Sequence, residues 1–99
     1  MERISLLIVD DHSLFRDGLR ALLERQDGLA VLGEAGDAEA GVRMAEELRP
    51  DVILMDLHMP GRSGVDAIRD ILRRRPSARI IALSMYQDAE LVESVILAG

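Results

Sequence analysis

Residues 51–61, which read DVILMDLHMPG, contain an apolar run that ends in a single acid before a turn. The run covers Val52 to Met55, the acid is Asp56, and a Pro-Gly pair follows. A short apolar run bounded by turn residues is typical of a strand buried on both faces of a parallel sheet. Open α/β sheets bind ligands at the carboxyl ends of their strands, so we expect the chemistry of this chain at Asp56.

The composition indicates one small domain. The chain has 99 residues, of which 48% are hydrophobic, and this is enough for a single core. No apolar run reaches the length of a membrane span and no signal segment opens the chain, so we expect no membrane partner. A net charge of −6 argues against direct nucleic-acid binding. The absence of cysteine fits a reducing cytoplasm, which is the expected location.

Strand-like and helix-like patterns alternate along the whole chain. The predicted strands cover residues 4–9, 29–35, 52–55 and 79–83. The predicted helices cover residues 13–25, 38–48 and 64–75, and a last one begins after Asp88. Four successive strand–helix units indicate an α/β fold, with a parallel sheet, right-handed crossovers and helices on both faces. Gly33 and Glu34 interrupt the second strand and suggest an edge position for it.

The helical periods also predict which side chains face the sheet. In the first helix Ser13 is the expected N-cap, and Arg16 and Arg20 lie on the face opposite the apolar one. The apolar positions of that helix are Leu14, Phe15, Gly18, Leu19, Leu22 and Leu23. The second helix, capped by Asp37, is expected to turn Ala40, Met44, Ala45 and Leu48 inward. The run Arg73 to Arg75 is expected to interact with the end of the third helix and with solvent.

Three of the four predicted strands end in polar residues. These are the pair Asp10 and Asp11, then Asp56, then Ser84. Carboxylates brought close together repel one another unless a cation is bound, and oxygen ligands of this kind suit Mg²⁺. Such an ion orients and neutralises a phosphoryl group, and a carboxylate such as Asp56 can attack it to form an aspartyl phosphate. The Ser84 hydroxyl is placed to donate a hydrogen bond to that group.

These motifs together resemble the receiver domain of bacterial two-component response regulators. The resemblance rests on Asp10-Asp11 after an apolar strand, Asp56 in DLHMPGRSG and Ser84 in IIALSMY. The segment LIVDDHSLFRDGL resembles the NarL/FixJ group, whose receivers are joined to a LuxR-type DNA-binding output domain. The resemblance implies a flavodoxin-like doubly wound sheet of strand order 2-1-3-4.

The resemblance also implies the roles of the site residues. Asp56 would accept phosphate from a sensor histidine kinase, and Ser84 would be the switch hydroxyl. Asp11, Asp56 and the backbone carbonyl of His58 would ligate Mg²⁺, with Asp10 supporting the ion through a water. The domain would thus act as a two-state signalling switch in transcription regulation.

The chain departs from the family pattern at its carboxyl end. Receivers carry a fifth strand that ends in a lysine and then a fifth helix, whereas this chain has no lysine and ends before both. The resemblance therefore implies one receiver domain over residues 1–99, truncated before the fifth strand and helix and without an output domain. Their loss would expose the fourth strand, the first helix and the last helix, so we expect self-association through one of them.

Simpler interpretations exist for each of these residues. Asp10 can be a loop acid and Ser84 a turn serine, while His12 and His58 are expected to be loop residues with solvated rings. At the level of function, the chain can instead be a receiver fragment that folds and self-associates but does not switch. A small Mg²⁺-dependent phosphohydrolase is less favoured, because such enzymes need a second acid where this chain has His58. We therefore expect no turnover enzyme.

Overall fold

The computed structural model describes residues 3–59 and 64–83. Along these residues strands and helices alternate, as predicted. The elements are β1 (Ile4–Val9), α1 (Ser13–Glu24), β2 (Leu29–Ala35), α2 (Ala38–Leu48), β3 (Val52–Asp56), α3 (Gly64–Arg74) and β4 (Arg79–Leu83). Each bound lies within one residue of its prediction. The predicted last helix after Asp88 lies outside the described residues, as does Ser84.

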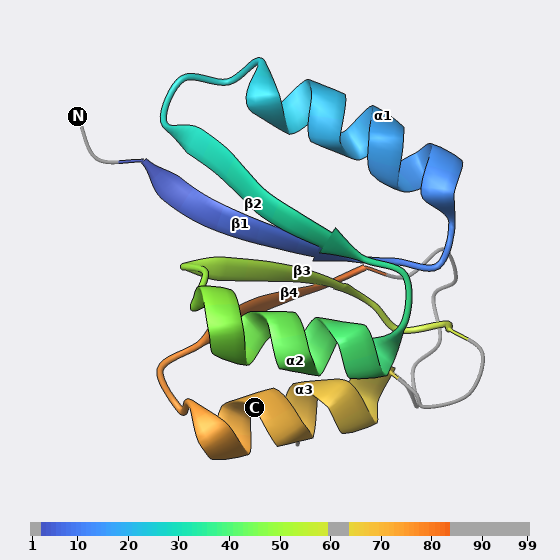
Figure 1. The fold of residues 1–99 in the computed structure, drawn as a ribbon, viewed down its shortest axis with the longest axis vertical. Helices are drawn as coiled ribbons and strands as arrows, with labels where there is room; N and C mark the ends of the chain where they lie inside the picture. The colour runs from blue at the N-terminus through green and yellow to red at the C-terminus, as the bar shows by residue number, and fades with distance from the viewer. Residues whose placement is uncertain (1–2, 60–63, 84–99) are drawn as a thin grey trace.

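The four strands form one parallel sheet in the order β2-β1-β3-β4. Helix α1 covers one face of this sheet, and α2 and α3 lie side by side on the other (Figure 1). The predicted α/β doubly wound fold is therefore confirmed, including the edge position of β2. Because all strands run the same way, the residues that follow β1 and β3 meet at one edge of the sheet.

The main core lies between the sheet and the helices α2 and α3. The central strands β1 and β3 supply its least exposed side chains, as their largely apolar sequences predict. These are Leu7, Val9, Ile53 and Met55, and Ile8 on the opposite face and Pro50 are fully buried as well. The helices contribute Val42, Ala45, Val65, Ile68 and Ile71. Each such aliphatic side chain contributes about 1.5–3 kcal/mol by leaving water, so this layer holds the two central strands in place.

The pairing of β1 with β2 contains a bulge. Leu6 pairs with Val31, but the next residue, Leu7, pairs with Gly33, so Leu32 is an extra residue on the edge strand. Bulges are common on edge strands. At Gly33 the chain approaches α2 closely, since a Cβ there would lie 2.6 Å from Cε of Met44. Glycine at this position therefore lets α2 pack directly on β2.

Helix α1 differs from its prediction in three respects. It begins at Ser13, so the N-cap is His12, whose side chain makes no capping hydrogen bond. Leu14, which the helical period places on the apolar face, is 84% exposed, while the exposure of Phe15 and Leu22 agrees with the expectation that the first helix is exposed. Arg16 and Arg20 do not point away from the sheet, because Glu34 on β2 offers both of them a carboxylate partner.

The other helices follow their predictions more closely. The carboxylate of Asp37 accepts a hydrogen bond from the Ala40 amide at 2.8 Å and caps α2, as expected. Leu48 faces Gly33 of β2, as predicted, but it is still 37% exposed because it is the last residue of α2 and lies beside the edge strand. The basic run at the end of α3 has specific partners: Arg74 pairs with Glu46 of α2, and Arg75 donates to the carbonyl oxygen of Pro50 at 2.9 Å.

Candidate metal centre

The first acid of the site follows β1 directly. The Asp10 amide donates to the Ala35 carbonyl at 3.0 Å, which extends the pairing of β1 with β2 by one residue. Its carboxylate accepts a hydrogen bond from the His12 amide at 2.8 Å. Short acidic side chains often bond the backbone two residues on, and this closes a tight turn. The turn holds Asp10 at the edge of the sheet.

The second acid, Asp56, ends β3 in the same way. Its carboxylate accepts a hydrogen bond from the His58 amide at 3.0 Å, again two residues further along. The next amide, that of Leu57, donates to the Leu83 carbonyl at 3.1 Å and ties the loop to β4. Asp10 and Asp56 are only 4% and 6% exposed. Two adjacent strands therefore each deliver a buried carboxylate to the same edge.

Four side chains converge at this edge. Asp10, Asp11, His12 and Asp56 each offer one atom, and these atoms all lie within 4.8 Å of one another. The structure thus brings together the three carboxylates that the sequence singles out. It also adds His12, whose Nδ1 lies 2.8 Å from Oδ1 of Asp10, 3.0 Å from Oδ1 of Asp11 and 3.9 Å from Oδ2 of Asp56. The sequence signal for His12 is its position directly after a strand-end Asp-Asp pair.

The charges of the cluster shift the protonation equilibria of its members. Burial raises the pKa of the Asp56 carboxyl, and the charges of Asp10 and Asp11 raise it further, while the His58 amide opposes the shift. The hydrogen bond to Asp10 raises the pKa of His12, and the Asp11 charge adds to this effect. The site thus has an excess of negative charge that favours any cation, whether a proton or a metal ion.

The donor set also fits a hard divalent cation. Oδ1 of Asp11 is buried and, within the part of the chain that the structure describes, it accepts no hydrogen bond. The Nδ1 atom of His12 lies 3.0 Å from this oxygen without forming a hydrogen bond, and a buried carboxylate oxygen in this position is stabilised further by a positively charged ligand. Carboxylate oxygens are the ligands that Mg²⁺ prefers. Asp10, Asp11 and Asp56 are therefore the residues that can hold such an ion.

The predicted roles of His58 and Ser84 in the site stay predictions. His58 lies two residues beyond Asp56 and its amide donates to the Asp56 carboxylate, whereas ligation by its carbonyl stays a prediction. Ser84 lies outside the described residues, so its role as the switch hydroxyl also stays a prediction.

Comparison with known proteins decides the family. Residues 6–99 match the model of the response regulator receiver domain. The chain belongs to this family. As a receiver domain, it is 48% identical over 96 residues to the transcriptional regulatory protein LiaR of Bacillus subtilis, covering 97% of this chain and 46% of the relative. It is also 38% identical over 97 residues to DegU of Brevibacillus brevis, covering 98% of this chain and 41% of the relative.

Solved structures show the same receiver fold. A LuxR-family two-component response regulator from Aurantimonas superposes with a TM-score of 0.94 at 38% identity, covering 99% of this chain and 70% of that one. The receiver domain of the putative response regulator NarL from Mycobacterium tuberculosis gives 0.92 at 29% identity, covering 100% of this chain and 80% of that one. The receiver thus spans less than half of the length of the curated relatives named above.

No helix among residues 3–59 and 64–83 is long and apolar enough to cross a membrane.

Proposed function

We propose that this receiver accepts a phosphoryl group on Asp56 from a phosphorylated histidine of a sensor kinase. The observation that carries the proposal is the convergence of Asp10, Asp11 and Asp56 within 4.8 Å, with a buried oxygen of Asp11 that lacks a hydrogen-bond partner. Buried like charges are costly, so a site that keeps three of them together is built to bind a cation. Membership of the receiver family supports the same role.

In the proposed reaction an oxygen of Asp56 attacks the phosphorus of the phosphohistidine. An oxygen–phosphorus bond forms and the phosphorus–nitrogen bond breaks, and the histidine nitrogen of the kinase keeps the electron pair and takes up a proton. Asp56 must be ionised to attack. The His58 amide assists this, because its hydrogen bond to the Asp56 carboxylate lowers the pKa that burial raises.

Asp11 and Asp56 would hold Mg²⁺, together with the His58 carbonyl and, through a water, Asp10. When bound, the ion supplies positive charge that offsets the charge of the phosphoryl oxygens. The buried position of Asp56 keeps bulk water from competing for the same carboxylate. Ser84 would donate its hydroxyl to the phosphoryl group and report its arrival to the surface of the domain.

We further propose that this exchange takes place in the cytoplasm and controls transcription. Two of the relatives carry the description of transcriptional regulatory proteins. The domain would act as a stoichiometric acceptor that promotes its own phosphorylation rather than as a turnover enzyme. The acidic net charge of −6 supports a role without direct nucleic-acid contact by this chain.

Two measurements test the proposal. In the first, Mg²⁺ is titrated while the melting temperature is followed, and a bound ion should stabilise by about 2.7 kcal/mol at a hundred times its dissociation constant. The variants Asp11→Ala and Asp56→Ala should lose this effect. In the second, the chain is incubated with a small phosphodonor and weighed by mass spectrometry. One added phosphoryl group that is absent in Asp56→Asn supports the proposal, and no addition in the presence of bound Mg²⁺ supports a non-switching fragment instead.

Self-association is a separate part of the proposal. Among the described residues β4 pairs only with β3, and Ile81 on it is exposed, as are Leu14 and Phe15 on α1. Unpaired strand edges and contiguous apolar faces favour association of copies. The last helix is the third candidate surface, although it lies outside the described residues. Sedimentation velocity over a range of concentrations tests this, and a monomer at the highest concentration would refute it.

A further inference from the structure

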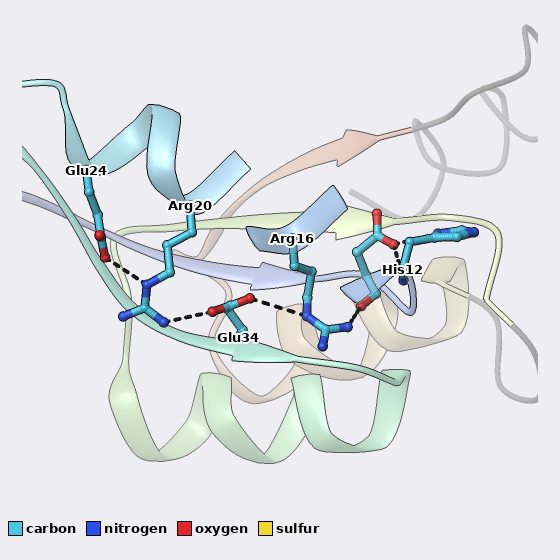
Figure 2. A network of polar contacts seen from close by, with 6 residues as sticks. His12, Arg16, Arg20, Glu24 and Glu34 are labelled. Atoms are coloured by element: carbon cyan, nitrogen blue, oxygen red, sulfur yellow. Dashed lines mark hydrogen bonds and ion pairs between the residues drawn. The ribbon is translucent and has the colours of Figure 1, made fainter. Parts of the chain in front are cut away.

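A chain of polar contacts joins α1 and β2 to the backbone of the acidic site. Figure 2 shows Arg16 and Arg20 reaching from α1 to opposite oxygens of Glu34 on β2. Arg16 Nε lies 3.4 Å from Oε1 of Glu34, and Arg20 Nη1 lies 2.8 Å from Oε2. Arg20 is itself held by Glu24 one turn further along α1, at 2.7 Å. At the other end of the chain, Arg16 Nη1 donates to the carbonyl oxygen of Asp10.

The hydrogen bond from Arg16 to the Asp10 carbonyl affects the backbone that leads into Asp11. It belongs to the peptide unit that joins Asp10 to Asp11, and a peptide unit is planar. The preceding peptide is already fixed, because the Asp10 amide donates to the Ala35 carbonyl at 3.0 Å. With Arg16 bound to the carbonyl, the plane that leads into Asp11 is fixed as well. The direction in which the Asp11 side chain leaves the backbone therefore depends on Arg16.

The burial of the network distinguishes it from the other ion pairs of the surface. The side chains of Arg16 and Glu34 are 19% and 20% exposed, whereas those of the Arg74–Glu46 pair are 52% and 60% exposed. The Arg16 guanidinium also lies against Gly36, where a Cβ would be 3.4 Å from Nη1. Among the described residues, the buried Nε atom of Arg16 makes no hydrogen bond and faces Glu34 as an ion pair, so the guanidinium is held by this charge contact, by its bond to the Asp10 carbonyl and by packing.

We propose that Arg16 is a positioning residue, which fixes the Asp10–Asp11 peptide so that the Asp11 carboxylate faces Asp56. Glu34 orients the Arg16 guanidinium, and Arg20 holds Glu34. Metal affinity is thereby coupled to the packing of α1 on β2. The inference rests on the proposed Mg²⁺ site where metal affinity is measured. A second measurement, the solvent exchange of a backbone amide, depends on the backbone geometry alone.

When Arg16 is removed, the electrostatic effect and the loss of positioning change the Mg²⁺ affinity in opposite directions. Arg16 contacts the backbone of the site rather than its carboxylates, so its substitution removes none of the proposed metal ligands. Removing its positive charge makes the region more negative, which by Coulomb attraction alone strengthens Mg²⁺ binding. Loss of the fixed peptide instead weakens binding, because the ligands must be ordered when the ion enters. Weaker binding is therefore specific to the positioning role.

The first experiment compares Arg16→Met with the matched control Arg74→Met. Both changes remove a guanidinium from an ion pair with a glutamate and keep a long apolar side chain. Mg²⁺ affinity is measured by titration, with apo stability recorded in parallel. We expect Arg16→Met to weaken Mg²⁺ binding by about 10-fold, a size typical of residues that orient metal ligands. Arg74→Met should leave the affinity unchanged. Equal or tighter binding in Arg16→Met would overturn the proposal.

The second experiment uses metal-free protein and the His12 amide, which donates to Asp10 at 2.8 Å. Its solvent-exchange rate is measured by nuclear magnetic resonance. We expect faster exchange in Arg16→Met, a smaller increase in Glu34→Gln and wild-type exchange in Arg74→Met. If Arg16→Met does not fold, Glu34→Gln decides, and unchanged exchange in it would overturn the proposal. A wild type that binds no Mg²⁺ would refute the proposed function, while this second experiment would still test the positioning role.

Discussion

Asp56→Asn should make the metal-free protein more stable, although it removes the residue proposed to accept phosphate. The substitution keeps an oxygen that can still accept the hydrogen bond from the His58 amide. It removes a buried negative charge that lies among Asp10 and Asp11. Because no compensating cation is bound in metal-free protein, the loss of this charge relieves repulsion and should raise the free energy of unfolding.

The size of the effect follows from the geometry. Two unit charges 4.8 Å apart repel by about 0.9 kcal/mol in bulk water and by about 3.5 kcal/mol at an effective dielectric constant near 20. The carboxylate of Asp56 is buried, which favours the upper part of this range, while the nearby His12 ring offsets some of the repulsion. We therefore expect a gain of about 1–2 kcal/mol, which raises the melting temperature of a domain of this size by roughly 4–16 °C.

Thermal unfolding in a chelating buffer, recorded between pH 4 and pH 7, measures the effect. The pKa of Asp56 is raised in the folded state, so the folded wild type takes up a proton as the pH falls, and its disadvantage fades. The gap between the variant and the wild type should therefore be largest at pH 7 and close as the pH approaches the ordinary value of 3.8. A variant less stable than the wild type at pH 7 would refute the reasoning.

Three further predictions test other parts of the structure. Asp51→Asn should lower stability at pH 7, because the Asp51 carboxylate accepts hydrogen bonds from the Ser5 amide and hydroxyl at 2.8 and 3.0 Å, and the neutral amide oxygen of asparagine accepts them more weakly than a charged one. These bonds lower the pKa of Asp51, so the stabilisation is present above pH 3.8 and disappears as the pH falls through the depressed value; a pH series of unfolding curves measures it. Gly64→Ala should cost about 1–3 kcal/mol in chemical denaturation, because the new Cβ would meet the Asp56 carbonyl and lie 2.8 Å from Cα of Leu57. Adding Mg²⁺ should stabilise the wild type more than Asp56→Asn, and equal melting-temperature shifts would contradict a role for Asp56 in binding the ion.

The fold was predictable because its signals are periodic. The nearly continuous apolar runs of β1 and β3 lie at the centre of the sheet, and the weaker pattern of residues 29–35 lies at an edge. Convergence of Asp10, Asp11 and Asp56 followed from the same reasoning, since parallel strands bring their carboxyl ends to one edge. The sheet and the meeting of these acids depend only on the order of strands and helices, and the apolar pattern of the sequence predicts that order.

The differences concern contacts that the periodic pattern does not encode. Helical period alone places Arg16 on the face opposite the apolar one, but Glu34, eighteen positions away, draws it toward the sheet. His12 is a loop residue with an exposed side chain, as expected, and the structure adds that its ring contacts Asp10 and Asp11. The Arg16 contact leaves no local pattern, because it depends on how α1 and β2 are placed relative to each other. The N-cap of α1 is His12 rather than Ser13, a shift of one position at a helix end, where the periodic signal is weakest.

The bulge at Leu32 places a constraint on how the length of β2 can change. Side chains alternate between the two faces of a strand, so strict alternation from Val31 through Leu32 and Gly33 would place Glu34 on the face opposite Val31. The bulge resets the alternation, and Glu34 shares the α1 side with Leu6 and Ile8, while Gly33 lies under α2. A strand that kept all its residues but lost the bulge would move a carboxylate beneath Met44 and remove the partner of Arg16. Deletion of Leu32 would instead restore regular pairing with Glu34 still opposite Ile8, so in this short edge strand the bulge and its extra residue can only be lost together.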